Sequence, residues 1–229
     1  MMWVSAVRGM VVCSVLVLAA ALAPGSAQAQ DLADFDYENL SFRGLGLEWG
    51  YMFPTRVEPT QSVGLRMDLG YLGPGVRIVP SVSYWSSRFK AGEVQELEDQ
   101  VGSLIADQTD GAVPPVDLGV IDWSDVVLSL DAQAVWQVPH GVLTFAGLGV
   151  SAHVMNGDGA AIDGTFVEDL LDSVTAGFNL HAGLEYPMDR FRPYAAGRYE
   201  IQGDLQYFEI RLGGQIMFGP AAPGEERSR

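Results

Sequence analysis

Apolar and polar residues alternate along eight stretches of this chain. In residues 128–137 the even-numbered positions are Leu, Leu, Ala, Ala and Trp, whereas the odd-numbered positions are Ser, Asp, Gln, Val and Gln. A period of two predicts a strand with one apolar face and one polar face. The repeated pattern therefore predicts an all-β protein.

The predicted strands end at turns rich in Gly and Pro. They cover residues 42–53, 62–72, 76–89, 123–137, 142–155, 174–186 and 191–202, and the last runs from a hairpin at 203–204 to residue 218. Pro80 lies on the apolar face of the third strand, which indicates a bulge or a weaker strand there.

Two long connections interrupt the series, at residues 91–122 and 156–172. The first repeats apolar residues at helical spacing, which predicts an amphipathic helix. Its apolar positions are Val94, Leu97, Val101, Leu104 and Ile105. The second is acidic, and a short helix is expected around residues 167–171. Its spacing of acidic residues does not match a calcium-binding EF-hand loop.

The N-terminus has the features of a secretory signal. Arg8 precedes an apolar run over residues 10–23, and an A-x-A cleavage site follows at residues 27–29. We expect residues 1–29 to be a cleaved signal peptide and residues 30–40 to be a periplasmic lead-in. The single cysteine, Cys13, lies in the signal, so the mature chain has no disulfide and no thiolate nucleophile.

The chain is strongly acidic, with 29 Asp and Glu against 13 Lys and Arg. This balance argues against nucleic acid as a partner and against electrostatic docking on anionic lipid. Lys90 is the only lysine, whereas a water-exposed protein surface normally carries many.

The lengths of the connections predict how the strands are arranged. If both termini lie in the periplasm, the turns at residues 73–75, 139–141 and 187–189 are all periplasmic and short, and both long connections lie outside. This asymmetry is typical of outer-membrane barrels. We therefore predict an eight-stranded antiparallel up-and-down transmembrane β-barrel over residues 41–218, with short periplasmic turns and two long outer loops. Residues 219–229 form a polar C-terminal tail.

The last strand adds a resemblance to a known family. Residues 211–218 read RLGGQIMF, and the positions of Gly213, Ile216 and Phe218 resemble the terminal-strand signature of outer-membrane barrels. With its strand pattern, the mature chain resembles the small OmpA/OmpX-type outer-membrane barrels. The resemblance implies a monomer in the outer membrane of a Gram-negative cell. Its implied partners are membrane lipid, lipopolysaccharide and the barrel-assembly machinery.

Alternation alone does not show which face points outward. A soluble lipocalin-like barrel in the periplasm, carrying a hydrophobic ligand, would show the same pattern with its apolar face inside. Glycines on the polar face, aromatic residues at the ends of the apolar faces and the scarcity of lysine favour the membrane barrel.

The interior of an eight-stranded barrel is just wide enough to be filled by side chains. We expect the charged inward residues to form ion pairs that plug the lumen, because an unpaired buried charge is costly. The predicted network consists of Glu48, Arg66, Asp68, Arg77, Asp131, His181, Glu185, Arg198, Glu200, Glu209 and Arg211. A narrow pore or small-solute transporter similar to OmpW is the alternative, and it would need a loosely filled lumen.

Catalysis is not expected, and neither is a cofactor or metal. Lipid A deacylases, which are barrels of similar size, carry a Ser two residues after a His on one strand. Met155 and Gly183 stand at that position after His153 and His181. A lipid-modifying hydrolase would need a serine near one of these histidines in space, and the nearest candidates on the inward face are Ser129 and Ser151.

Overall fold

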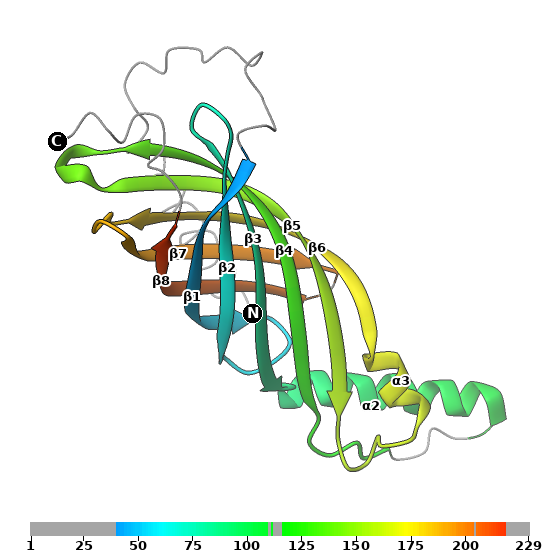
Figure 1. Cartoon of the computed structure of the whole chain (residues 1–229). Helices are drawn as coiled ribbons and strands as arrows, with labels where there is room; N and C mark the ends of the chain where they lie inside the picture. The colour runs from blue at the N-terminus through cyan, green and yellow to red at the C-terminus, as the bar shows by residue number, and fades with distance from the viewer. Residues whose placement is uncertain (1–39, 110, 112–115, 204, 219–229) are drawn as a thin grey trace, which may run out of the picture.

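The eight strands close into a single antiparallel barrel in which each strand pairs with the next along the chain and β8 pairs with β1 (Figure 1). The computed structural model describes residues 40–109, 111, 116–203 and 205–218. The strands are β1 (Leu40–Pro54), β2 (Thr60–Gly73), β3 (Val76–Arg88), β4 (Asp122–Gln137), β5 (Leu143–Asp158), β6 (Ser173–Glu185), β7 (Phe191–Gln202) and β8 (Leu205–Met217). The predicted fold class is confirmed.

The predicted signal peptide at residues 1–29 and the tail at 219–229 lie outside the described residues, as does the lead-in except for Leu40, which begins β1. The second long connection is shorter than predicted, because β5 continues to Asp158. Backbone pairing of Asn156 and Gly157 with β4 extends the strand there. Among the described residues, no helix is both long enough and apolar enough to cross a membrane.

Pro80 lies where the pairing of β2 with β3 changes register. Arg66 pairs with Ser81 and the next pair is Tyr71 with Arg77, so β2 carries one extra residue in this interval. Proline has no N–H to donate to a neighbouring strand, and a bulge accommodates that gap. On its other side Pro80 keeps regular register with Leu130 of β4.

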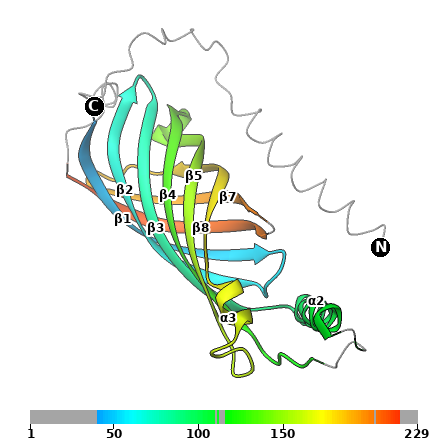
Figure 2. The same cartoon turned by 90° about the vertical axis from the view of Figure 1, so that its right-hand side faces the viewer.

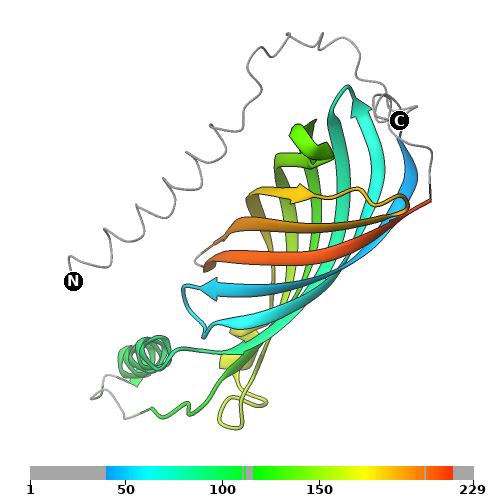
Figure 3. The same ribbon diagram turned by 90° about the vertical axis from the view of Figure 1, so that its left-hand side faces the viewer.

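The two ends of the barrel differ in their connections. We call the end with the three short connections at 74–75, 138–142 and 186–190 the turn end, and the opposite end the helix end. At the turn end Gly75 adopts a left-handed φ of 76° after Pro74, which closes a two-residue turn. The helix end carries α2 (Ala91–Thr109) and α3 (Phe166–Leu171), as Figures 2 and 3 show from two sides.

The barrel exposes apolar side chains and buries charged ones. Leu47, Leu128, Val150 and Leu180 are each more than half exposed on the outer surface. Arg77 and Glu200 are fully buried inside. The orientation of a soluble ligand carrier, with an apolar interior, is therefore not the one that the chain adopts.

An apolar cap closes the lumen at the helix end. It consists of Met52, Val57, Trp85, Phe89, Val101, Leu118, Ile121, Trp123, Val127, Met155, Ile162, Val167, Leu205 and Tyr207. Trp123 packs edge-to-face on Trp85 with ring centroids 6.3 Å apart and contacts Phe89 at 5.0 Å. Val94 and Leu97 of α2 pack against this cap, so the first half of the helix folds over the barrel mouth.

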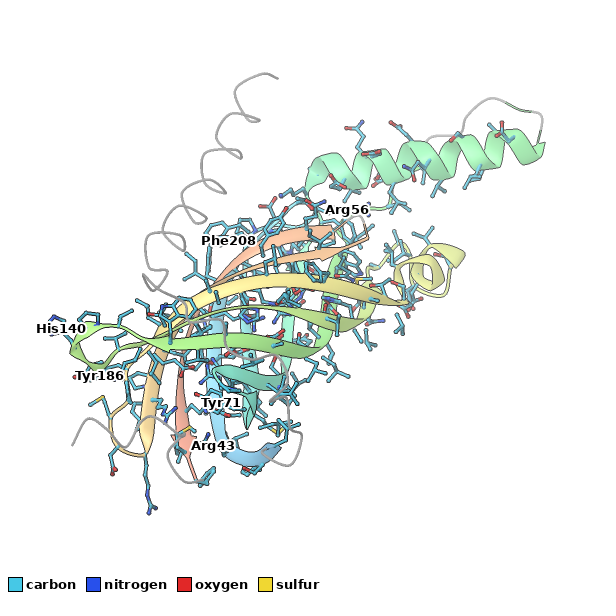
Figure 4. All side chains as sticks on the ribbon, turned by 90° about the horizontal axis from the view of Figure 1, so that it is seen from above. Arg43, Arg56, Tyr71, His140, Tyr186 and Phe208 are labelled. Atoms are coloured by element: carbon cyan, nitrogen blue, oxygen red, sulfur yellow. The ribbon has the colours of Figure 1, made fainter. Side chains whose placement is uncertain are left out.

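Three polar contacts hold the beginning of α2 at the mouth. Lys90 Nζ donates hydrogen bonds to the carbonyl oxygens of Pro54 and Thr55, both at 2.8 Å. Arg56 Nε lies 2.8 Å from Glu93 Oε2. Arg56 is labelled beside the start of α2 in Figure 4, and His140 and Tyr186 are labelled at the opposite end of the barrel.

Candidate functional site in the barrel lumen

All eleven residues of the expected lumen network lie buried on the inward face of the barrel. Each is at most 9% exposed. Strand parity places them there, because every second side chain of a barrel strand points inward. They join other buried polar residues that the expected network did not include, among them Arg43, Ser62, Asp125, Gln133, Ser151, His153, Asn179, Arg192, Gln202 and Gln215.

A first group of ion pairs lies toward the turn end. Arg77 of β3 donates to both carboxylate oxygens of Glu185 on β6, at 2.8 and 2.6 Å. Arg66 Nη2 lies 3.3 Å from the same carboxylate. Arg77 also approaches Asp68 at 3.5 Å, and Gln215 donates to Asp68 at 3.3 Å. Because these residues come from β2, β3, β6 and β8, the group joins opposite sides of the wall.

A second group fills the middle of the lumen. Arg198 lies 3.3 Å from Asp131 and 2.7 Å from Glu200, and it donates to Ser129 at 2.7 Å. The amide nitrogen of Asn179 donates a hydrogen bond to Asp131 Oδ1 at 3.0 Å, and its carbonyl oxygen lies 2.8 Å from His181 Nδ1. Ser129 therefore binds a guanidinium and does not contact a histidine here.

Gln133 links the first two groups. Its carbonyl oxygen accepts hydrogen bonds from Arg77 at 3.1 and 2.6 Å, and its amide nitrogen lies 3.2 Å from His181 Nε2. The contacts therefore form a continuous side-chain network along the lumen.

A third group connects β1, β7 and β8. Arg211 contacts Glu209 at 2.6 Å and Glu48 at 2.9 Å. Tyr194 donates its hydroxyl hydrogen to Glu48 at 2.8 Å, and the Arg66 guanidinium lies over the Tyr194 ring at 4.3 Å. Ser62 hydrogen-bonds Glu209 from β2. The cation–π contact joins this group to the first.

Glycines on the inward face leave room for these side chains. A Cβ atom added at Gly149 would lie 1.9 Å from Asp131 Oδ1. At Gly177 it would lie 2.6 Å from Glu200 Oε1 and 2.8 Å from His153 Nε2. All three distances are far below ordinary contact, so the network fits because these two positions lack a side chain.

His153 stands at the centre of a fourth group, directly below the apolar cap. Its Nδ1 lies 2.7 Å from Asp125 Oδ2, and its Nε2 lies 3.0 Å from Ser151 Oγ and 3.5 Å from Glu200 Oε1. Ser151 also hydrogen-bonds Glu200. The His153 ring is fully buried between the two carboxylates.

Of the two serines named as candidates near a histidine, Ser151 lies beside His153, with its Oγ 3.0 Å from Nε2, and its hydroxyl donates to Glu200. This serine precedes the histidine by two residues, whereas the deacylase pattern places a serine two residues after the histidine. Ser151, His153 and Asp125 have the connectivity of a nucleophile, its base and an orienting acid. Because residues two apart on a strand share a face, Ser151 could be found from parity; Asp125 comes from the neighbouring strand.

A small cavity of about 20 Å³ lies in the described part of the lumen. Polar residues including Arg66, His181 and Arg198 line it. A volume of this size holds about one water molecule. Neither Ser151 nor His153 lines this cavity.

The residues of the terminal-strand signature have distinct environments. Gly213 faces inward beneath Tyr194, where an added Cβ would lie 2.3 Å from the ring. Ile216 and Phe218 are exposed on the outer surface. Phe218 stacks on Phe42 with ring centroids 5.7 Å apart. The structure thus gives Gly213 a packing role of its own.

No profile of a known protein family matches the sequence, and no curated protein matches it. Among solved structures, the chain is similar to Neisserial surface protein A, with a TM-score of 0.50 and 13% identity over 77% of this chain and 97% of that chain. Ail of Yersinia pestis gives a TM-score of 0.46 and 12% identity over 78% and 100%. The N-terminal barrel domain of Pseudomonas aeruginosa OprF gives 0.43 and 13% over 76% and 97%.

The chain has the fold of the small outer-membrane β-barrels. The similarity to the Neisserial protein shows this fold. The resemblance to OmpA/OmpX-type barrels is therefore confirmed for the fold. The fold by itself does not define an activity, because function depends on the residues that a fold carries.

Proposed function

We propose that this protein is an outer-membrane β-barrel with a closed lumen, which acts as a structural or surface-interaction protein through its helix end. The observation that carries the proposal is the inverted distribution of side chains, with an exposed apolar outer wall and a charged, hydrogen-bonded interior. Only a lipid environment makes such an outer wall favourable over its whole circumference. The longer connections of outer-membrane barrels face outward, so the helix end is assigned to the cell exterior.

Cell fractionation and heat-modifiability test the location. In cells that express the full chain, we expect the protein in the outer-membrane fraction, with an unboiled band that migrates faster than the boiled one. Recovery of the folded protein from the periplasmic fluid would contradict the proposal.

The lumen groups support a closed barrel over a pore. Ion pairs join strands on opposite sides of the wall, and the apolar cap covers the helix end. In planar bilayers we expect the purified barrel to give no stable conductance. Steady channels that Arg77→Ala or Glu185→Ala enlarges would instead support the narrow-pore alternative.

A non-catalytic role is proposed for the Ser151, His153 and Asp125 group. The Glu200 carboxylate accepts a hydrogen bond from Ser151 and lies beside His153 Nε2. A carboxylate in this position repels the oxyanion that acyl transfer would form, whereas hydrolases place hydrogen-bond donors there.

A fluorophosphonate probe, which labels activated serines, tests this assignment. We expect no labelling of the folded barrel. Labelling that disappears in Ser151→Ala and persists in Ser129→Ala would establish a nucleophile and overturn the non-catalytic assignment.

The assignment to the outer membrane implies the remaining partners. Membrane lipid and lipopolysaccharide surround the outer wall, and the barrel-assembly machinery recognises the terminal strand with Gly213, Ile216 and Phe218. The barrel has no unpaired strand edge, because β1 and β8 pair with each other, and this supports a monomer. Size-exclusion chromatography with light scattering in detergent tests the monomer.

A further inference from the structure

The apolar face of α2 continues beyond the barrel mouth. Val101 belongs to the cap, and Val94 and Leu97 pack against it. Leu104 and Ile105 follow at helical spacing on the same face, and they are 53% and 36% exposed. Figures 1 and 4 both show the second half of α2 running past the barrel wall. The barrel therefore covers one half of the helix face and leaves the other half in solvent.

Helix α2 is acidic. Residues 91–109 include no Lys or Arg. The acidic residues of α2 are Glu93, Glu96, Glu98, Asp99 and Asp107. The other connections at the helix end add Asp117, Asp163, Glu168 and Asp172. These charges produce a negative potential at the helix end of the barrel.

The basic residues described at this end already have partners. Arg56 pairs with Glu93 at 2.8 Å, and Arg88 pairs with Asp122 at 3.4 Å. Lys90 donates to backbone carbonyl oxygens at the barrel rim. They therefore leave most of the acidic side chains of α2 without a cationic partner within the described chain.

We propose that this face of α2, formed by Leu104 and Ile105 with Asp107 and Glu96 along one edge, docks a basic amphipathic segment of another protein. Such a segment places apolar side chains on Leu104 and Ile105 and basic side chains beside Asp107, which lies one turn from Leu104, and Glu96 on the same edge of the face. Complementary charge attracts the partner and orients it, and the apolar contact retains it. The inference rests on the proposed function, because it requires the helix end to face outward.

Charge also distinguishes this partner from other occupants. A second copy of the chain would bring an equally acidic surface against the first. The anionic phosphates of lipopolysaccharide would be repelled by the same acidic residues. A basic polypeptide is the partner whose charge and apolar face both match α2.

A direct binding measurement tests the inference. The full-length barrel is inserted in zwitterionic nanodiscs, and the probe is a fluorescent amphipathic helical peptide of Lys and Leu. A second peptide with Glu in place of Lys is the control, together with empty nanodiscs. We expect the Lys peptide to bind, with an affinity that falls as salt is added, and the Glu peptide not to bind. Equal binding of both peptides, or equal binding to empty nanodiscs, would overturn the inference.

Variants of α2 then locate the contact. The double substitution Leu104→Gln with Ile105→Gln preserves helix propensity and removes the apolar contact, so it should weaken binding roughly tenfold. The matched control is Gln95→Ala, which changes an exposed residue on the side of the helix away from this face and should bind as the original chain does. An unchanged affinity in the double variant would reject this face as the docking site.

The orientation of the barrel is measured separately, by protease cleavage of α2 on intact cells. If the peptide binds in nanodiscs but α2 is protected on cells, the docking face stands and the proposed surface role fails. If α2 is cleaved but the peptide does not bind, the surface role stands and this inference fails.

Discussion

The guanidinium of Arg77 and the carboxylate of Glu185 form a two-point hydrogen-bonded pair across the lumen, with Nη1–Oε2 at 2.8 Å and Nη2–Oε1 at 2.6 Å. The two residues lie on β3 and β6, which are not neighbours in the sheet. Parallel N–H···O bonds of this kind fix geometry as well as charge. The pair therefore connects opposite walls of the barrel.

Removing one partner of this pair should destabilise the barrel strongly. Arg77→Met or Glu185→Gln alone leaves a buried charge with a poorer partner, which costs about 3 kcal/mol or more of unfolding free energy. The double variant should cost less than the sum of the two, with a coupling energy above about 1 kcal/mol. Urea unfolding in lipid vesicles, followed by tryptophan fluorescence, measures this. Additive effects would show that the two side chains do not interact.

Arg88→Gln serves as the control for that cycle. Arg88 and Asp122 form an ion pair whose side chains are 70% and 55% exposed. Exposed pairs contribute about 0–1 kcal/mol, so this variant should have nearly the same free energy of unfolding as the original chain.

The position of Gly213 should not tolerate a side chain. In Gly213→Ala, the Cβ would lie 2.3 Å from the Tyr194 ring and 2.6 Å from the Leu47 carbonyl oxygen. Tyr194 must move, which disturbs its hydrogen bond to Glu48, and overpacking of this kind costs about 1–3 kcal/mol. Gly197→Ala is the control, because its nearest contact, to Phe208, would be an ordinary 3.4 Å. Equal heat-modifiability and equal stability of the two variants would contradict this packing role.

A charged residue on the outer wall should lower the free energy of unfolding by an amount that depends on its depth in the bilayer. Leu128 lies near the middle of β4, and Val174 lies near the helix end of β6. In a bilayer, Leu128→Arg should cost about 2–4 kcal/mol and Val174→Arg about 0–1 kcal/mol. Reversible unfolding into vesicles measures both. If Leu128→Arg were as stable as the original chain, the outer wall would be facing water.

His153 should be required for stability. His153→Gln removes the ring that bridges Asp125 and Ser151, and it leaves the Asp125 and Glu200 carboxylates without that ring between them. The loss of a partner to a buried charge predicts a cost of about 3 kcal/mol.

Adding Asp125→Asn to His153→Gln should recover part of that stability, because it removes one of the two carboxylates. His140→Asn is the control, since His140 is exposed in a turn with a left-handed φ of 72° that Asn accepts. No recovery in the double variant would show that charge at Asp125 is not the cause of the loss.

The sequence by itself determined the strands and their inward faces. A period of two fixes which residues share a face of a strand, so Glu48, Arg77 and Glu200 could be assigned to one side without coordinates. The contrast between short and long connections gave the up-and-down order, and helical spacing gave α2. These features are local, and local patterns remain readable in a linear sequence.

Only the tertiary structure decided which inward residues meet. The pairing of Arg77 with Glu185 and of Asp125 with His153 depends on register, on the tilt of the strands and on the bulge near Pro80, because these set the height of each side chain in the lumen. The sequence pattern also did not predict the apolar cap. Trp85 and Trp123 share the inward parity of the charged residues, and they form the cap because α2 and the connections fold back over the barrel mouth. Contacts between distant segments follow from closure of the barrel, which no local pattern specifies.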